Sequence, residues 1–180
     1  MVYLLLANGF EEVEALAPVD LLRRAGAQVT LVGIGGKEIV GARGVTVVTD
    51  ITEREADLSD MDLLILPGGY PGYVHLEESA FVQTAIDKAV SKGVLIGAIC
   101  AAPTILGHKG LLAGKVATCY PGMEEGLIGA VHSVDDVCVD GNFITSRSAA
   151  TALEFALKLT ELYCGIAAKE TLQQQIAFKE

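Results

Sequence analysis

The sequence lacks several patterns that would assign a function directly. No apolar run approaches the roughly 18 residues of a membrane-spanning helix, and Met1–Tyr3 enters a strand-like run with no basic segment before it. The glycine loops that hold nucleotide phosphates, GxxxxGK[ST] and GxGxxG, are both missing. We therefore expect a cytoplasmic protein that has no membrane segment and binds no cofactor.

Positive charge and clustered metal ligands are also scarce. Thirteen Lys and Arg against 23 Asp and Glu give a net charge of −10, which repels phosphate backbones, so we expect no nucleic-acid partner. The cysteines are nearly evenly spaced and form no C-x-x-C pair or Cys/His cluster. We therefore expect neither a disulfide framework nor a metal site.

What is present is an alternation of strand-like and helix-like segments. With 180 residues, 51% hydrophobic and 20 glycines, the chain fits one α/β domain spanning residues 1–180. The predicted strands are Val2–Ala7, Gln28–Val32, Val45–Val48, Leu63–Leu66, Val94–Ile99 and Lys115–Thr118, with a hairpin of Cys138–Val139 and Phe143–Ser146. The alternation and the strands' continuous apolar runs predict a parallel sheet covered on both faces.

The helices are predicted from apolar periodicity and from capping residues. Pro18 is expected to kink or restart the first helix, Ser79 to cap the second, and Phe81, Val82, Ile86 and Val90 to form its apolar face. The predicted ranges are 11–25, 79–92, a helix after residue 100 that runs to about Leu112, 151–163, and Lys169–Lys179.

The stretch Val94–Thr104 carries the clearest sign of chemistry. An apolar run of strand length ends on Cys100, followed by small residues and by Pro103, which suits a first helical turn. This order predicts a sharp strand-to-helix bend like the nucleophile elbow of α/β enzymes. Since a helix N-terminus presents unpaired N–H groups, we expect Cys100 to be a nucleophile with a favoured thiolate.

A cluster of acidic residues lies in the loop and helix start after the first predicted strand. Glu11 and Glu14 share one helix face, whereas Glu12 points away. A carboxyl group held in an apolar crevice beside a thiolate has a raised pKa and can donate a proton to it. Spacing alone leaves the choice between Glu11 and Glu14 open, and carboxylates in a first turn often only complement the helix dipole.

The loops after three predicted parallel strands are expected to converge at one edge of the sheet. They are Asn8–Glu14, Pro67–Tyr73 and Cys100–Pro103. In the second loop, Gly68 and Gly69 either bring backbone N–H groups to a ligand, as in an oxyanion hole, or form a plain tight turn.

The remaining candidates are weaker. Cys119 and Tyr120 follow a short strand and are expected near the crevice, whereas Cys138 and Cys164 are expected to pack in the interior. The histidines His75, His108 and His132 have no partner at a telling distance and are predicted to lie on the surface.

Five segments also carry a family resemblance. They are Asn8–Glu14 with Pro18–Gly26, Leu66–Gly69, Ala98–Pro103, Asp140–Gly141 with Thr145–Arg147, and Glu154–Ala156. In this order, over nearly the whole chain, they resemble the ThiJ/PfpI superfamily, and most closely its parkinsonism-associated protein deglycase branch.

This resemblance implies a flavodoxin-like three-layer α/β sandwich with a mostly parallel central sheet, in a homodimer. It implies that Glu14 is the protonated glutamate that hydrogen-bonds the cysteine, and that Cys100 is the oxidisable nucleophile. The resemblance also implies nearby backbone amides at Gly68, Gly69 and Ala101, and arginines near the dimer interface and pocket at Arg24 and Arg43.

Two positions depart from relatives of this family. Protease-like members carry a histidine directly after the nucleophile, where this chain has Ala101, so no peptidase triad is expected. Some deglycase-branch members carry a histidine where this chain has Tyr120. A base at that point of a reaction would have to be Glu14 or a water molecule.

We therefore expect a glyoxalase or deglycase that needs no cofactor and acts on a small reactive carbonyl compound, with Cys100 as nucleophile and Glu14 as proton shuttle. The alternative is a redox-sensing stress protein or chaperone in which Cys100 is oxidised to sulfinate. A third hypothesis, a role in thiazole or thiamine metabolism, has no phosphate-binding loop to support it.

Overall fold

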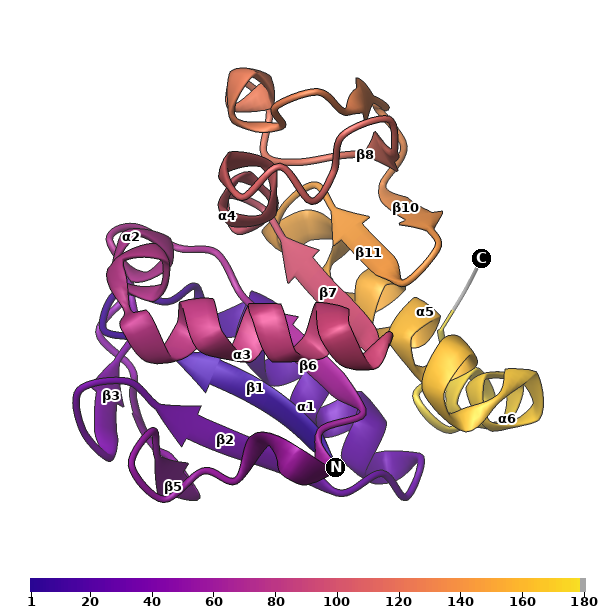
Figure 1. Cartoon of the computed structure of the whole chain (residues 1–180). Helices are drawn as coiled ribbons and strands as arrows, with labels where there is room; N and C mark the ends of the chain where they lie inside the picture. The colour runs from indigo at the N-terminus through magenta and orange to yellow at the C-terminus, as the bar shows by residue number, and fades with distance from the viewer. Residues whose placement is uncertain (179–180) are drawn as a thin grey trace.

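Within residues 1–178, which the computed structural model describes, seven strands form one central sheet. Its order is β10-β11-β7-β6-β1-β2-β5, and every neighbouring pair is parallel except the edge pair β10–β11 (Figure 1). These strands are β1 (Val2–Leu6), β2 (Val29–Gly33), β5 (Ile51–Thr52), β6 (Leu63–Leu66), β7 (Leu95–Ile99), β10 (Val137–Asp140) and β11 (Phe143–Ser146). The predicted, mostly parallel sheet is confirmed.

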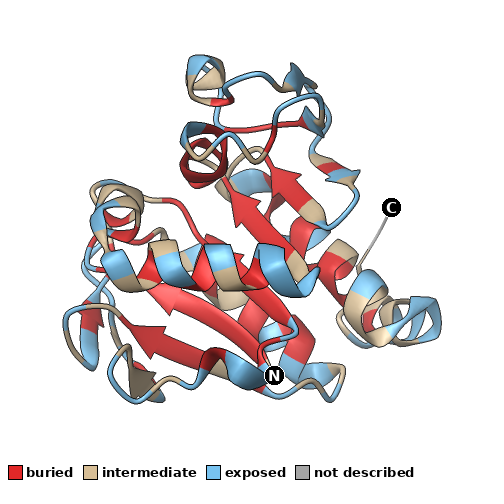
Figure 2. Cartoon of the chain, in the orientation of Figure 1, coloured by how far each residue is buried: buried red, intermediate tan, exposed pale blue. Residues whose placement is uncertain are grey.

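Helices cover both faces of the sheet, which makes the three-layer sandwich. Successive side chains of a strand point to opposite faces, so Leu4 packs with α1 and α5 whereas Leu5 packs with α3 and α4. Both layers bury the inner strands almost completely, whereas the edge strands β5 and β10 are partly exposed (Figure 2). The helices are α1 (Glu12–Arg24), α2 (Gly72–Glu78), α3 (Ala80–Lys92), α4 (Pro103–His108), α5 (Ala152–Cys164) and α6 (Ile166–Gln175).

The order of the strands places a crevice at the carboxyl end of the sheet. After β1 the chain adds β2 on one side and later returns to add β6 on the other side. The loops after β1 and β6 therefore diverge to opposite faces at a topological switch point, where open α/β sheets bind their ligands. The loop after the next strand, β7, lies beside them.

Short elements outside the sheet were predicted less well. The strand β4 (Thr46–Val48) pairs antiparallel with β3 (Glu38–Val40), which was not predicted. The strands β8 (Val116–Ala117) and β9 (Val131–His132) form a second small ladder, and single 3-10 turns lie at η1 (Leu58–Asp60), η2 (Glu124–Gly126) and η3 (Ala149–Thr151).

The helices correct several predictions. Pro18 lies inside α1, which is not restarted there. The helix after Cys100 ends at His108 rather than near Leu112, and α2 was not predicted at all. Val90, predicted on the apolar face of α3, is 40% exposed, because Ala85 and Ala89 complete that face.

The bounds of the last predicted helix also differ. The last helix spans Ile166–Gln175 rather than Lys169–Lys179, and Lys179 lies outside the described residues. No helix within residues 1–178 combines the length and the apolarity that a membrane crossing requires.

Candidate active site

Cys100 occupies the sharp turn between β7 and α4, as the sequence predicts. Its φ of 65° is in the left-handed region, which costs an L-residue about 1–2 kcal/mol. Two hydrogen bonds fix its backbone: its N–H donates to the carbonyl of Ser146 (2.9 Å), and its carbonyl accepts from the N–H of Tyr120 (2.7 Å). The strand β11 and the segment after β8 therefore hold the strained residue in place.

Glu14 lies in the first turn of α1 with only 1% of its surface exposed. Its Oε2 accepts a hydrogen bond from the N–H of Gly68 (2.9 Å), and its carboxyl group also hydrogen-bonds the Cys100 thiol. Burial raises the pKa of Glu14 to about 7, although both hydrogen bonds act in the opposite direction. Of the two glutamates that spacing left open, Glu14 contacts the sulfur.

The glycine pair after β6 lets these groups come together. A Cβ at Gly68 would lie 2.7 Å from Oε2 of Glu14 and 2.8 Å from Cβ of Cys100. Gly69 has a φ of 94°, and a Cβ there would lie 2.2 Å from the backbone nitrogen of Glu11. Neither position has room for a side chain. The close approach of these segments therefore requires glycine at both positions.

The environment of the thiol corrects one expectation. Burial raises the pKa of Cys100, and the negative charge of Glu14 raises it further, whereas the N–H groups of Ala101 and Gly69 lower it. The six-residue helix α4 does not outweigh the buried carboxylate. Since the two groups titrate as a pair, the thiolate is favoured only while the shared proton resides on Glu14.

A pocket of about 310 Å³ opens over the sulfur. On its rim, Arg43 forms an ion pair with Glu11 (3.4 Å). Arg43 is carried by the turn between β3 and β4, and Oε1 of Glu12 accepts from the N–H groups of Arg43 (2.8 Å) and Val45 (3.3 Å). The pocket is lined by Glu11, Arg43, Gly69, Tyr70, Tyr73, Cys100, Ala101, Tyr120 and Met123.

Four residues singled out from the sequence do not line this pocket: the buried Glu14 described above, and Gly68, Cys119 and Arg24. The N–H of Gly68 is engaged by Glu14, so the amides at the sulfur come from Gly69 and Ala101. Cys119 is 1% exposed and packs in the core on the α3 side of the sheet. Arg24 is exposed near the end of α1, where it pairs with Asp20 (2.9 Å).

Tyr70, Tyr73 and Met123 line the pocket but were not singled out beforehand. The two tyrosines belong to the loop that was expected to converge on the site, so their position in that loop was the available signal. Met123 reaches the pocket from the irregular segment before η2, where no helix or strand periodicity in the sequence indicates the direction of its side chain.

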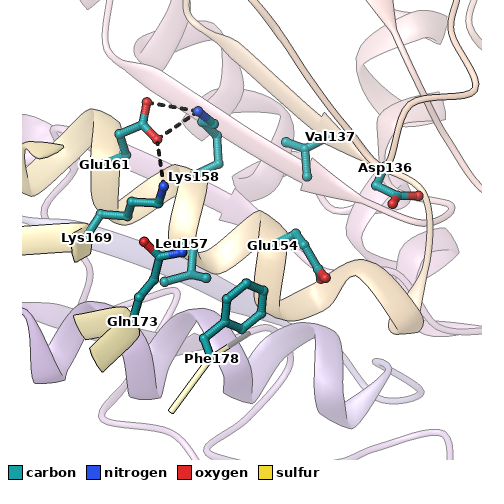
Figure 3. A pocket seen from close by; sticks show the side chains of 9 residues that line it. All are labelled: Asp136, Val137, Glu154, Leu157, Lys158, Glu161, Lys169, Gln173 and Phe178. Atoms are coloured by element: carbon teal, nitrogen blue, oxygen red, sulfur yellow. Dashed lines mark hydrogen bonds and ion pairs between the residues drawn. The ribbon is translucent and has the colours of Figure 1, made fainter. Parts of the chain in front are cut away.

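A separate hollow of about 300 Å³ lies where α5, α6 and β10 meet (Figure 3). Lys158 and Lys169 both approach Glu161 there, at 2.8 and 4.0 Å. None of the predicted site residues lines it. The three histidines are exposed, as predicted, and within residues 1–178 no cluster of three or more His, Cys, Asp or Glu could hold a metal ion.

The chain is similar to known proteins over most of its length. The sequence profile of the DJ-1/PfpI family matches residues 1–162. Protein dj-1beta of Drosophila melanogaster is 42% identical over 173 residues, covering 94% of this chain and 91% of that protein. The crystal structure of Drosophila DJ-1beta superposes with a TM-score of 0.93 at 36% identity, covering 99% of this chain and 98% of that chain.

Two further relatives are named by an activity. A glutathione-independent glyoxalase of Caenorhabditis elegans is 36% identical over 152 residues, covering 84% of this chain and 81% of that protein. A deglycase of Pyrococcus horikoshii is 38% identical over 149 residues, covering 81% of this chain and 89% of that protein.

Proposed function

The chain belongs to the DJ-1/PfpI family, and on that premise we propose that it is a glyoxalase or deglycase acting on 2-oxoaldehydes or their early adducts. Cys100 is the nucleophile and Glu14 moves the proton. One observation carries the proposal: a pocket sulfur touches a buried carboxyl group whose pKa lies at about 7. A group with such a pKa gives up and regains a proton readily near neutral pH. The named activities of the two relatives support the same reaction class.

The reaction needs only this pair and water. With the shared proton on Glu14, the Cys100 thiolate adds to the aldehyde carbon, and Glu14 protonates the aldehyde oxygen to give a hemithioacetal. Glu14, now a carboxylate, takes the hydrogen on that carbon as a proton and returns it to the ketone carbon. The hydroxyl proton of the hemithioacetal moves to the ketone oxygen, so the product is a thioester of a 2-hydroxy acid. Water cleaves the thioester and regenerates the thiol. The aldehyde carbon is oxidised and the ketone carbon reduced, so no external oxidant is required.

The test is production of lactate from methylglyoxal. We expect Cys100→Ser and Glu14→Ala to abolish it, because each removes one partner of the reacting pair. Cys164→Ser is the matched control, since Cys164 lies at the end of α5 and does not line the pocket. Full activity in both site variants would contradict the proposal.

A second function, redox sensing, is favoured by the unequal exposure of the cysteines. Cys119 and Cys138 are buried, whereas Cys100 and Cys164 are both partly exposed, and of these two Cys100 lines the pocket. Mild peroxide is expected to add two oxygens to Cys100, giving a sulfinate that a protonated Glu14 can hydrogen-bond. Peptide mass spectrometry after oxidation tests this, and oxygens found on Cys164 or Cys119 instead would count against it.

The assembly and location that the resemblance implied remain part of the proposal. We propose a cytoplasmic homodimer with exposed Arg24 near its interface. Light scattering coupled to size exclusion should report twice the 18.8 kDa chain mass, and a monomer would contradict it.

A further inference from the structure

Three tyrosines surround the opening of the pocket over Cys100. Tyr70 is 76% exposed and Tyr120 is 48% exposed, and Tyr73 lines the pocket with them. The rings of Tyr70 and Tyr73 lie with their centroids 6.5 Å apart and tilted by 49°. This separation is within the range of favourable aromatic pairs. The opening therefore offers flat apolar surface that is still exposed to solvent.

The backbone ties these rings to the reacting residues. The N–H of Tyr120 donates to the carbonyl of Cys100 (2.7 Å), and the N–H of Tyr73 donates to the carbonyl of Gly69 (2.9 Å). Tyr70 directly follows Gly69 in the chain. Each ring is thus placed through the same residues that place the sulfur and its amide donors. A substrate bound at Cys100 has to pass these rings or rest on them.

The volume of the pocket is larger than the smallest substrate of this reaction class requires. Methylglyoxal has five non-hydrogen atoms and phenylglyoxal has ten. A pocket of about 310 Å³ lies at the small end of the range of about 300–1,000 Å³ for small-molecule sites, so it has room for a phenyl group beside the dicarbonyl. Met123 adds a polarisable thioether to the lining, and thioethers pack favourably against aromatic rings.

We propose that the tyrosines Tyr70, Tyr73 and Tyr120 are specificity-determining residues that select 2-oxoaldehydes with an aromatic or similarly flat substituent. The substituent stacks on the tyrosine rings while the aldehyde carbon meets the sulfur of Cys100. This inference rests on the proposed function, because it names the substrate class of the same site.

The experiment compares kcat/KM for phenylglyoxal and methylglyoxal in the wild type and in variants. We expect the ratio to favour phenylglyoxal and to fall roughly two- to tenfold in each of Tyr70→Ala, Tyr73→Ala and Tyr120→Ala. The corresponding Tyr→Phe variants should keep the ratio, because they keep the ring. The change in the ratio between variants cancels the different intrinsic reactivities of the two aldehydes.

The control is Val134→Ala, which removes an exposed apolar side chain that does not line the pocket. It should leave the ratio unchanged. A ratio that stays constant in all three Tyr→Ala variants overturns the inference. Thermal melting checks that each variant is folded, and leucine, which keeps apolar bulk but has no ring, replaces alanine at any position where alanine unfolds the chain.

A second measurement separates this inference from the proposed function. Benzamide and acetamide are neutral and unreactive, and each is tested for protection of Cys100 against iodoacetamide. We expect benzamide to protect at lower concentration in the wild type, and this advantage to disappear in Tyr70→Ala. If neither methylglyoxal nor phenylglyoxal is turned over, the proposed function fails. The protection of Cys100 against iodoacetamide then decides by itself whether the tyrosines bind flat aromatic groups. Equal protection by the two amides then overturns it.

Discussion

Replacing Glu14 by glutamine tests the central feature of the site, the buried carboxyl group. The substitution keeps the size and shape of the side chain but removes its ability to ionise. Burial raises the pKa of Glu14 from its ordinary 4.5 to about 7, and one pKa unit corresponds to about 1.36 kcal/mol. Holding the ionised form of Glu14 in the folded protein therefore costs about 3 kcal/mol.

The sign of the effect follows from linkage. The folded state binds the Glu14 proton more tightly than the unfolded state does. Below about pH 4.5 the carboxyl group is protonated in both states, so ionisation of Glu14 does not lower the unfolding free energy of the wild type. This free energy then falls as the pH rises to about 7. Above about pH 7 the loss is complete and constant. Glu14→Gln has no such loss. Relative to the wild type, the variant should gain about 3 kcal/mol of unfolding free energy between pH 4.5 and pH 8.5.

Urea denaturation of both proteins at these two pH values measures the difference. A change of this size is readily detected in a domain whose whole stability is about 5–15 kcal/mol. The control is Glu78→Gln, which changes an exposed glutamate at the end of α2. If the difference between wild type and Glu14→Gln is the same at both pH values, the carboxyl group is not held as the structure indicates.

The same variant separates thiol reactivity from turnover. The negative charge of Glu14 raises the pKa of Cys100, and glutamine lacks that charge while its amide can still donate a hydrogen bond to sulfur. We expect Glu14→Gln to react with iodoacetamide at pH 8 at least as fast as the wild type. It should nevertheless produce no lactate, because the proton shuttle is gone. Slower alkylation would refute the assigned electrostatics.

Three other changes follow from the geometry. Gly68→Ala should reduce turnover by more than about tenfold, because the new Cβ would lie 2.7 Å from Oε2 of Glu14. The control Gly36→Ala should leave turnover unchanged, because a Cβ there has nothing within 4 Å. Equal rates of lactate production in the two variants would contradict this prediction. Cys100→Gly should be more stable than Cys100→Ala by about 1 kcal/mol in urea denaturation, because glycine tolerates the φ of 65°. A Cys100→Ala variant more stable than Cys100→Gly would count against a strained turn. Glu12→Ala should speed hydrogen exchange at the amides of Arg43 and Val45, because both donate to the carboxylate of Glu12. Unchanged exchange rates would mean that these hydrogen bonds do not hold the turn between β3 and β4.

The order of elements along the chain could be predicted because it depends on local patterns. Continuous apolar runs marked β1, β6 and β7, and such runs can be buried only in a sheet covered on both faces. The strained turn at Cys100 was predicted because a strand, small residues and a proline must reverse direction within a few residues. Short elements such as α2 and β3 were missed, since a few residues carry too little periodicity.

The assignment of roles within the site needed the tertiary structure. Spacing could not separate Glu11 from Glu14, because residues three apart share one face of the predicted helix. In the structure Glu11 is the extended residue before α1 and pairs with Arg43, whereas Glu14 in the first turn contacts the thiol. The side chain of Cys119 was expected at the pocket and lies in the core, because the side-chain direction of a strand-like segment depends on its register against its neighbours.

The sequence by itself determined which residues bear the chemistry and roughly where each lies along the strands and loops. Only the tertiary structure decided the electrostatic environment of the thiol. Local sequence places Cys100 at the start of a helix, which favours the anion, but folding brings the partly buried Cys100 against the carboxyl group of Glu14, which comes from a distant part of the sequence. Burial and charge between segments distant in sequence depend on packing in three dimensions, and no local pattern encodes them.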